Sequence, residues 1–313
     1  MEDNNKQIIL INNALVTFER QIAIGEKLLG LLINDDFFYE DSIRGKVART
    51  EWLKSLDEKW KDLLGVENAY TDSELLQVLR NLTEIDLSCN QISDVTPLVV
   101  LTKLTYLNLN RNEIIDISPL KALNNLTSLN LYKNKINDIF PLRTLTNLRN
   151  LDLSYNYDYS NKIDFTPLQS LTNLIYLKLN KTIMMDATPL NFLTNLTELD
   201  LSYNGISNVI PLQTLKNLTN LNLSQNQIID VSPLKPLSNL TELALVNNKI
   251  VDITPLQTLT NLTKLDLWNN KITDLSPLKN LTNLNRLTLN TSQDYSQLRE
   301  LMKSTGLKLG LIG

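Results

Sequence analysis

A repeat of about 22 residues constrains the fold of this chain more than any other feature of its sequence. A leucine opens each unit, and successive opening leucines keep one spacing except across the longer interval from Leu148 to Leu174. The ten opening leucines are Leu82, Leu104, Leu126, Leu148, Leu174, Leu196, Leu218, Leu240, Leu262 and Leu284. A unit this short cannot bury its own apolar face, so we expect neighbouring units to stack into a solenoid.

The apolar positions within a unit predict a short strand followed by a return path. In the first unit Leu82, Ile85 and Leu87 give the alternation of a strand. Four more aliphatic side chains follow at Ile92, Val95, Leu98 and Leu101. Stacked units would place these side chains in one continuous core, with the strands parallel to one another.

Prolines mark the return path. Nine of the ten prolines share one register: Pro97, Pro119, Pro141, Pro167, Pro189, Pro211, Pro233, Pro255 and Pro277. The segment Asp116 to Leu120 is typical, because serine or threonine suits a helix N-cap and proline suits the first turn. Few residues remain before the next leucine, so one turn of 3₁₀ or α-helix is predicted there. We expect the aspartates of this register to cap that turn rather than bind calcium.

Asparagine follows the predicted strand in eight units, at Asn90, Asn112, Asn134, Asn156, Asn204, Asn226, Asn248 and Asn270. A side-chain amide both donates and accepts hydrogen bonds, so stacked asparagines can satisfy backbone groups that no strand pairing reaches. Thr182 and Ser292 take the asparagine position in the fifth and tenth units. We therefore predict an asparagine ladder that is interrupted at the fifth unit.

The consensus L-T-N-L-T-x-L-x-L-x-x-N-x-I-x-D-[IV]-[ST]-P-L resembles the leucine-rich repeat of bacterial internalins and of the regulatory subunit of protein phosphatase-1. The resemblance covers about two thirds of the chain. It implies an α/β fold: a right-handed horseshoe with about ten parallel strands on the concave face and short 3₁₀ or α turns on the convex face. It also implies protein ligands bound on the concave face.

The ends of the chain predict two caps around the solenoid of residues 82–292. Residues 1–81 lack the repeat and are predicted to form a helical module and cap, with helices over 14–33 and 49–64 and a last helix capped by Thr71 or Asp72. Whether this module only caps the solenoid or works separately stays open. A helical cap is predicted for residues 293–313.

The composition argues against several functions. The chain has no histidine and one cysteine, Cys89, so the usual proton shuttle and the usual metal ligands are missing. We expect no enzyme activity and no cofactor. A net charge of −4 argues against nucleic acid and anionic membranes, and no apolar run is long enough to span a bilayer.

Localisation is predicted from the start of the chain. Residues 1–6 lack the positively charged region of a secretory signal, and no small-residue cleavage site follows residues 8–11, so a cytoplasmic protein is expected. A monomer is expected as well. Internalins, by contrast, are exported and attached to the cell surface, and an exported effector or adhesin remains the alternative.

The predicted interaction site lies on outward positions of the strands. Tyrosine, tryptophan and arginine dominate binding hot spots, and polar partners surround them. Insertions in solenoids often map to the binding face, and the four extra residues near Tyr155 to Lys162 are rich in tyrosine. The candidate protein-binding residues are Tyr106, Tyr132, Asp152, Tyr155, Tyr157, Tyr159, Tyr176, Lys178, Glu198, Asp200, Tyr203 and Trp268. Asp152, Glu198 and Asp200 could alternatively form an acid-base or cation site, and Lys178 between them favours charge balance instead.

Overall fold

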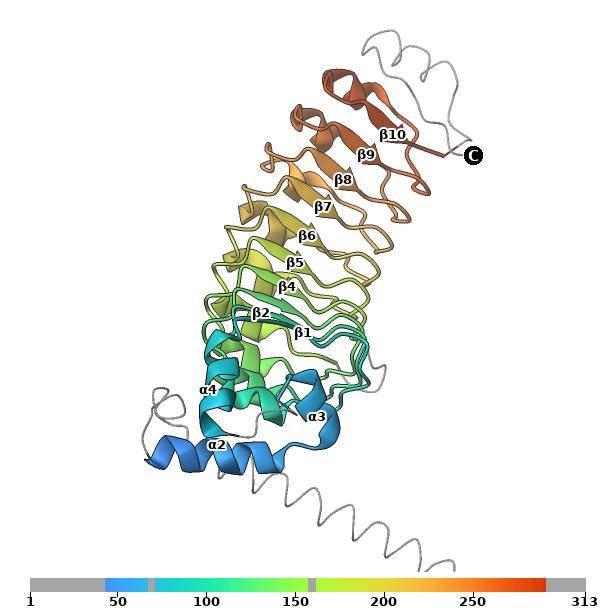
Figure 1. The fold of residues 1–313 in the computed structure, drawn as a ribbon. Coiled ribbons are helices and arrows are strands. Elements are labelled where there is room, and N and C mark those ends of the chain that lie inside the picture. Colours follow the sequence, from blue (N-terminus) through green and yellow to red (C-terminus); the bar gives the residue numbers. More distant parts are fainter. Residues whose placement is uncertain (1–42, 67–70, 157–161, 291–313) are drawn as a thin grey trace, which may run out of the picture.

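Ten short parallel strands form one sheet in chain order, as the repeat predicts (Figure 1). The computed structural model describes residues 43–66, 71–156 and 162–290. The strands are β1 (Glu84–Asp86), β2 (Tyr106–Asn108), β3 (Ser128–Asn130), β4 (Asn150–Asp152), β5 (Tyr176–Lys178), β6 (Glu198–Asp200), β7 (Asn220–Asn222), β8 (Glu242–Ala244), β9 (Lys264–Asp266) and β10 (Arg286–Thr288). Each residue pairs with the residue at the same position of the next unit.

The insertion in the fourth unit does not disturb this pairing. Leu151 of β4 pairs with Leu177 of β5 across the longer interval, just as Leu129 of β3 pairs with Leu151 across an interval of the usual length. The extra residues come after the strand and after Asn156, so the sheet keeps its register across the longest unit.

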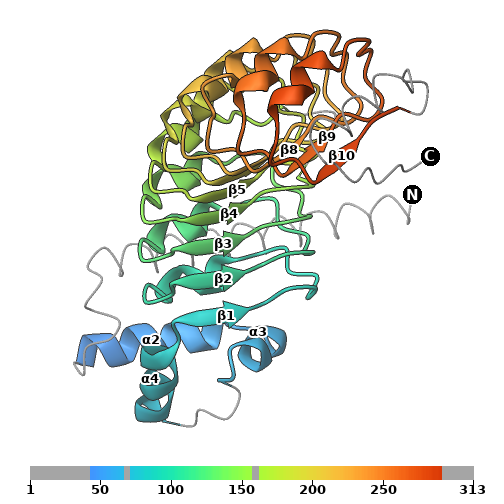
Figure 2. The same cartoon turned by 90° about the horizontal axis from the view of Figure 1, so that it is seen from above.

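A 3₁₀ helix returns the chain on the outer side of the curve in each of the first nine units, as Figure 2 shows. Within the described residues these helices span Thr96–Val100, Ser118–Ala122, Phe140–Thr144, Thr166–Ser170, Thr188–Phe192, Ile210–Thr214, Ser232–Leu234, Thr254–Thr258 and Ser276–Asn280. Proline occupies the first turn of each one. The alternation of a short strand and a short 3₁₀ turn confirms the predicted solenoid.

The predicted aspartate caps form at these turns, whereas the predicted serine or threonine N-cap does not. The aspartate, not the serine or threonine, accepts the hydrogen bond: Asp116 Oδ1 accepts from the Ser118 N–H at 2.7 Å, and the Ser118 hydroxyl donates to Asp116 Oδ2 at 2.9 Å. The residue that directly precedes the helix, Ile117, makes no side-chain cap. Asn208 serves in the same way in the sixth unit, where its Oδ1 accepts from the Ile210 N–H at 3.0 Å.

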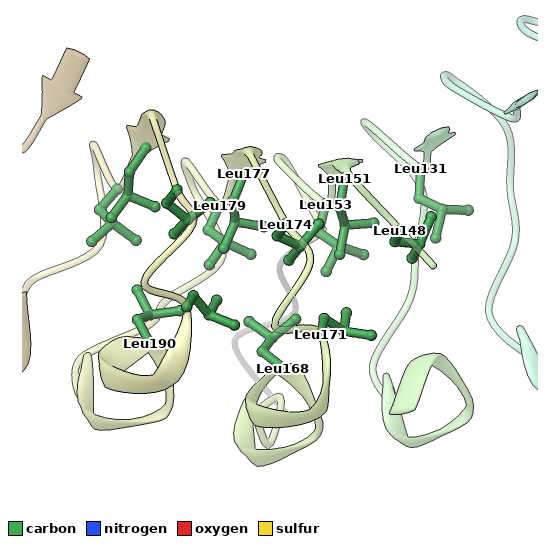
Figure 3. Close-up of a cluster of buried hydrophobic side chains, with 14 of the residues drawn as sticks. Leu131, Leu148, Leu151, Leu153, Leu168, Leu171, Leu174, Leu177, Leu179 and Leu190 are labelled. Atoms are coloured by element: carbon green, nitrogen blue, oxygen red, sulfur yellow. The ribbon is translucent and has the colours of Figure 1, made fainter. Parts of the chain in front are cut away.

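The core is one continuous column of aliphatic side chains between the sheet and the 3₁₀ turns (Figure 3). Leu151, Leu168 and Leu174 are each fully shielded from solvent. The first unit is looser, because Leu82 ends the preceding helix and both Leu82 and Ile85 are only partly buried.

Two adjacent core positions depart from the repeat in opposite directions. The position that holds isoleucine or valine in most units holds Phe165 in the fourth unit and Ala187 in the fifth. Both side chains are buried. A large residue next to a small one keeps the packed volume of the column close to that of two aliphatic residues.

The asparagine ladder forms as predicted. Asn134 Oδ1 accepts from the Ile114 N–H of the preceding unit at 3.1 Å, and its Nδ2 donates to the carbonyls of Leu109 and Leu131. At the interruption, the Thr182 hydroxyl donates to the Leu179 carbonyl at 2.8 Å. Threonine satisfies part of the backbone there, and Asn204 of the next unit accepts from the Thr182 N–H.

A helical module covers the N-terminal end of the solenoid beside β1 (Figure 1). It contains α2 (Ile43–Ser55), α3 (Glu58–Leu63) and α4 (Asp72–Asn81). The buried Trp52 donates from Nε1 to the Pro97 carbonyl at 3.0 Å, so the module is bonded to the first unit.

The single helix predicted over 49–64 is wrong, because α2 ends at Ser55 and the Asp57 carboxylate accepts from the Trp60 N–H to begin α3. The predicted cap at Thr71 is confirmed, and Glu74 completes a capping box.

Some predicted elements lie outside the described residues. These are the helix over 14–33, the C-terminal cap over 293–313 and the ladder position Ser292. Among the residues that the structure does describe, no helix is both long and apolar enough to cross a bilayer.

Candidate functional site

Each strand presents its first and third residues on the concave face, because the middle residue is a leucine that points into the core, or Ile85 in β1. The first row of this face runs Glu84, Tyr106, Ser128, Asn150, Tyr176, Glu198, Asn220, Glu242, Lys264 and Arg286. The second row runs Asp86, Asn108, Asn130, Asp152, Lys178, Asp200, Asn222, Ala244, Asp266 and Thr288. Pairing in register makes each side chain a neighbour of the side chains at the same position in adjacent units.

The second row has a structural task that the sequence analysis did not identify. Its aspartates and asparagines accept a hydrogen bond from the N–H two residues later and so turn the chain at the end of the strand. Asp152 accepts from Ser154 at 2.9 Å, and Asp200 accepts from Ser202 at the same distance. Two of the predicted binding residues, Asp152 and Asp200, therefore also shape the fold.

Lys178, Ala244 and Thr288 are the residues of the second row that are neither aspartate nor asparagine. Lys178 lies between Asp152 and Asp200 in the register, and its Nζ lies 5.1 Å from the centre of the Tyr176 ring. The pKa of Lys178 is raised, first by hydrogen bonding with the Tyr176 side chain and then by the two carboxylates. Burial raises the pKa of Asp152, against the opposing effects of the Ser154 hydrogen bonds and the Lys178 charge. This group therefore balances charge, as the sequence analysis favours.

A groove of about 450 Å³ runs along the concave face from β5 to β10. Tyr176, Lys178, Glu198 and Asp200 line its N-terminal half, and Ala244 leaves space in its middle. Lys264 forms a salt bridge of 2.5 Å with Glu242 across β8 and β9. Burial raises the pKa of Asp266 in its C-terminal half. The groove therefore combines one aromatic side chain with charges of both signs.

No group of three histidine, cysteine, aspartate or glutamate side chains in the described part of the chain is arranged to hold a metal ion.

Three predicted tyrosines lie elsewhere, where the chain leaves the strands. The rings of Tyr132 and Tyr155 are 5.1 Å apart, and Lys181 Nζ lies 4.8 Å from the Tyr155 ring and 5.1 Å from the Tyr203 ring. Arg111 lies 5.9 Å from the Tyr132 ring. We call these five residues the tyrosine–cation edge. Arg111 and Lys181 were not among the residues predicted from the sequence, although both directly precede the ladder position, as Tyr155 and Tyr203 do.

The predicted site is thus divided rather than continuous. Tyr106 belongs to β2, outside the groove, and Trp268 lies two residues beyond β9 with 42% of its surface exposed. Seven strand spacings of about 4.8 Å separate the units of these two residues by roughly 34 Å. One small hot spot cannot include both. Tyr157 and Tyr159 lie outside the described residues.

The chain matches known proteins by family and by structure. A family model described as leucine-rich repeats (2 copies) matches residues 80–122, 194–236, 216–258, 238–278 and 260–301. A search of curated proteins gives no match.

The structural relatives include internalins of Listeria monocytogenes. An internalin (inlF) of strain 4b F2365 is 30% identical with a TM-score of 0.64, over 82% of this chain and 88% of the relative. An internalin C2 (inlC2) of the same strain is 34% identical with a TM-score of 0.59, over 74% of this chain and 90% of the relative.

The functional domain of InlJ, whose structure includes a cysteine ladder, is 30% identical with a TM-score of 0.52, over 68% of this chain and 50% of InlJ. In the present chain asparagine, not cysteine, forms the ladder. The repeat, the stacked parallel strands and 30% identity across 88% of an internalin show that this chain belongs to the internalin family of leucine-rich-repeat proteins.

Proposed function

We propose that this chain is a non-enzymatic scaffold that binds a protein ligand in the concave groove over β5 to β10 and regulates a bound enzyme in the cytoplasm. The family supports the general part of this proposal, because leucine-rich-repeat proteins of this type serve protein–protein interaction and are typically not enzymes. The groove supports the choice of the concave face over β5 to β10 as the binding site.

The single observation that carries the proposal is the shape and chemistry of that groove. Six strands contribute to it, and side chains of both charges stand beside Tyr176 around the small Ala244. A protein interface of ordinary size covers about 800 Å² on each partner, and a ten-strand sheet of roughly 45 Å is long enough to supply it.

The experiment is affinity capture from the native host with mass spectrometry, using the full chain. Ala244→Arg should fill the groove, and the double variant Tyr176→Ala/Trp268→Ala should remove its aromatic anchor and the exposed indole near it. A partner captured by the wild type should be lost in both variants. Phe192→Ala, an exposed residue on the 3₁₀ side, serves as the matched control and should retain the partner.

Circular dichroism of each variant shows whether the solenoid stays folded. If the folded groove variants still capture the same partner as the control, the groove is not the binding site. Deletion of residues 157–161 tests the tyrosine-rich insertion in the same assay.

The alternative function is that of an exported effector or adhesin. The observation that favours it is the structural likeness to internalins. Fractionation of the native host decides between the two: accumulation in the cytosol supports the scaffold within the cell, and accumulation in the medium or on the cell surface supports the alternative.

A further inference from the structure

A second groove, separate from the concave one, lies beside the tyrosine–cation edge. Its volume is about 340 Å³, and Lys181, Tyr203, Gly205, Gln225 and Gln227 are among the residues that line it. These residues belong to the fifth, sixth and seventh units and come after the strands, so this groove opens where the chain turns away from the sheet.

Beside this second groove, the backbone hydrogen bonding at Gly205 differs from that of other units. In several other units the residue after the ladder asparagine donates its N–H to an isoleucine carbonyl of the preceding unit, as Lys135 does to Ile114 at 2.9 Å. Gly205 instead donates to Asn226 Oδ1 at 2.9 Å. Its φ of +92° suits glycine, and the nearest atom that a Cβ would meet is Met185 Cγ at 4.0 Å. The glycine thus leaves one side of the groove without a side chain.

The cation beside this groove is held in place before any ligand arrives. Lys181 is half-buried, and its ammonium lies between the rings of Tyr155 and Tyr203. Within the described residues it forms no salt bridge, whereas Lys135 of the third unit is paired with Glu113 at 3.1 Å. A cation that is positioned but not neutralised can bind an anion without first ordering its own side chain.

The charge of this edge differs from that of the whole chain. The chain carries a net charge of −4, yet Arg111, Lys133 and Lys181 all directly precede a ladder position along this edge. The amides of Gln225 and Gln227 add hydrogen-bond donors on the far side of the groove. A negatively charged ligand therefore complements this edge.

We infer that this edge is a second binding site that takes a short acidic segment of a partner protein, with a glutamate or aspartate carboxylate of that segment on Lys181 Nζ. The tyrosines from Tyr132 to Tyr203 span three unit spacings, or roughly 14 Å, which about four residues of extended chain would cover. The exposed ring of Tyr203 would pack against the stem of an acidic side chain.

The test uses a fluorescein-labelled hexaglutamate peptide and the full chain, with binding measured by fluorescence anisotropy at low salt. The wild type should bind. Lys181→Gln should weaken binding by about tenfold or more, because a charge-assisted hydrogen bond is lost, whereas Lys181→Arg should largely retain it. Lys249→Gln, an exposed lysine three units further along, should change binding by less than about twofold.

Two further arms separate this site from the alternatives. Ala244→Leu, which narrows the concave groove without adding a charge, should leave hexaglutamate binding unchanged, so the result is independent of the proposed scaffold function. Absence of hexaglutamate binding, or equal losses for Lys181→Gln and Lys249→Gln in variants that stay folded, would overturn the inference. Binding of inorganic tripolyphosphate but not of hexaglutamate would identify a small-anion site and would also overturn it.

Discussion

The buried ladder asparagines each bond to the backbone of two units, and Asn134 is representative. It satisfies the Ile114 N–H and the carbonyls of Leu109 and Leu131 with 8% of its surface exposed. Each backbone group left unsatisfied in the interior costs about 1–3 kcal/mol.

We predict that Asn134→Ala lowers the free energy of unfolding by about 1–3 kcal/mol, because the Ile114 N–H loses its acceptor. The carbonyls of Leu109 and Leu131 keep the hydrogen bonds that Asn112 and Asn156 donate to them. Urea denaturation followed by circular dichroism measures the change. The control is Lys121→Ala on the exposed side of a 3₁₀ turn, which should shift stability by less than about 0.5 kcal/mol. Similar losses for the two variants would contradict a structural role for the ladder.

At Asp152 the structure predicts a pH-dependent effect of a single substitution. Burial raises the pKa of this carboxyl in the folded chain, so the folded state holds its proton more tightly than the unfolded state. The resulting stability is fully present below the unfolded pKa and is lost as pH rises through the folded pKa. Asparagine occupies the same position in β2, β3 and β7 and keeps the turn acceptor without the charge.

Asp152→Asn should therefore be more stable than the wild type at neutral pH, and the difference should shrink towards zero as pH falls through the range in which the carboxyl becomes protonated. Urea denaturation of both proteins at several pH values measures this difference. Other aspartates contribute equally to the stability of both proteins, so their pH dependence cancels in the difference. One of them is Asp186, whose pKa is lowered by its hydrogen bonds with Thr188. A constant difference at all pH values would exclude the burial of Asp152 as the cause.

Among the elements, the 3₁₀ turns of the fourth and fifth units follow a pair of residues that compensate one another in volume. Phe165 and Ala187 occupy equivalent positions in neighbouring units, and both are buried. Residues in contact within one packed core do not contribute additively to stability.

We predict that Phe165→Ile lowers stability by leaving a cavity and that Ala187→Ile lowers it by about 1–3 kcal/mol through overpacking. The double variant Phe165→Ile/Ala187→Ile should lose less than the sum of the two, because it restores the volumes found in other units. A double-mutant cycle by urea denaturation measures the coupling. The pair Phe165→Ile and Ile253→Val, which lies four units away, should be additive and is the control.

The place of the insertion within the fourth unit explains why the sheet keeps its register. The insertion comes between Asn156 and the next 3₁₀ turn, and β4 stays in register with β5. The aspartates that precede eight of the nine prolines were correctly predicted to cap the turns. The serine or threonine that follows was also expected at the N-cap, but Ser118 donates its hydroxyl to Asp116 instead, and residue spacing does not express that difference in side-chain direction.

For the whole molecule, the N-terminal module shields the open end of the core. Trp52 is fully buried and bonded to the Pro97 carbonyl of the first unit. Repeat proteins are stabilised by contacts between nearest neighbours, so the loss of a cap should affect the units beside it most.

Trp52→Ala should lower the free energy of unfolding by about 3–5 kcal/mol, as removal of a large buried aromatic side chain does. Native-state hydrogen exchange should show faster exchange of the amides in β1 and β2 and little change in β7 to β9. Trp268→Ala, at an exposed tryptophan, is the matched control and should have a much smaller effect. Uniformly faster exchange along the solenoid would contradict the nearest-neighbour description.

Repeated positions in the sequence were enough to specify the solenoid, the number and register of its strands, the asparagine ladder and the position of each return turn. These features depend on positions that recur from unit to unit, and each unit contacts only its neighbours, so the sequence of one unit and the next is enough to predict them. The grouping of the outward side chains, by contrast, followed from the three-dimensional arrangement of the units.

That arrangement separated the predicted tyrosines into a concave groove around Tyr176 and an edge around Lys181, and it divided the helix predicted over 49–64. The physical reason is that a surface site is assembled from side chains of several units, and its shape depends on the direction in which each side chain leaves the backbone. At the edge that direction is set by left-handed residues such as Tyr155 and Lys181, with φ of 60° and 53°, and the periodic pattern of leucines does not specify it.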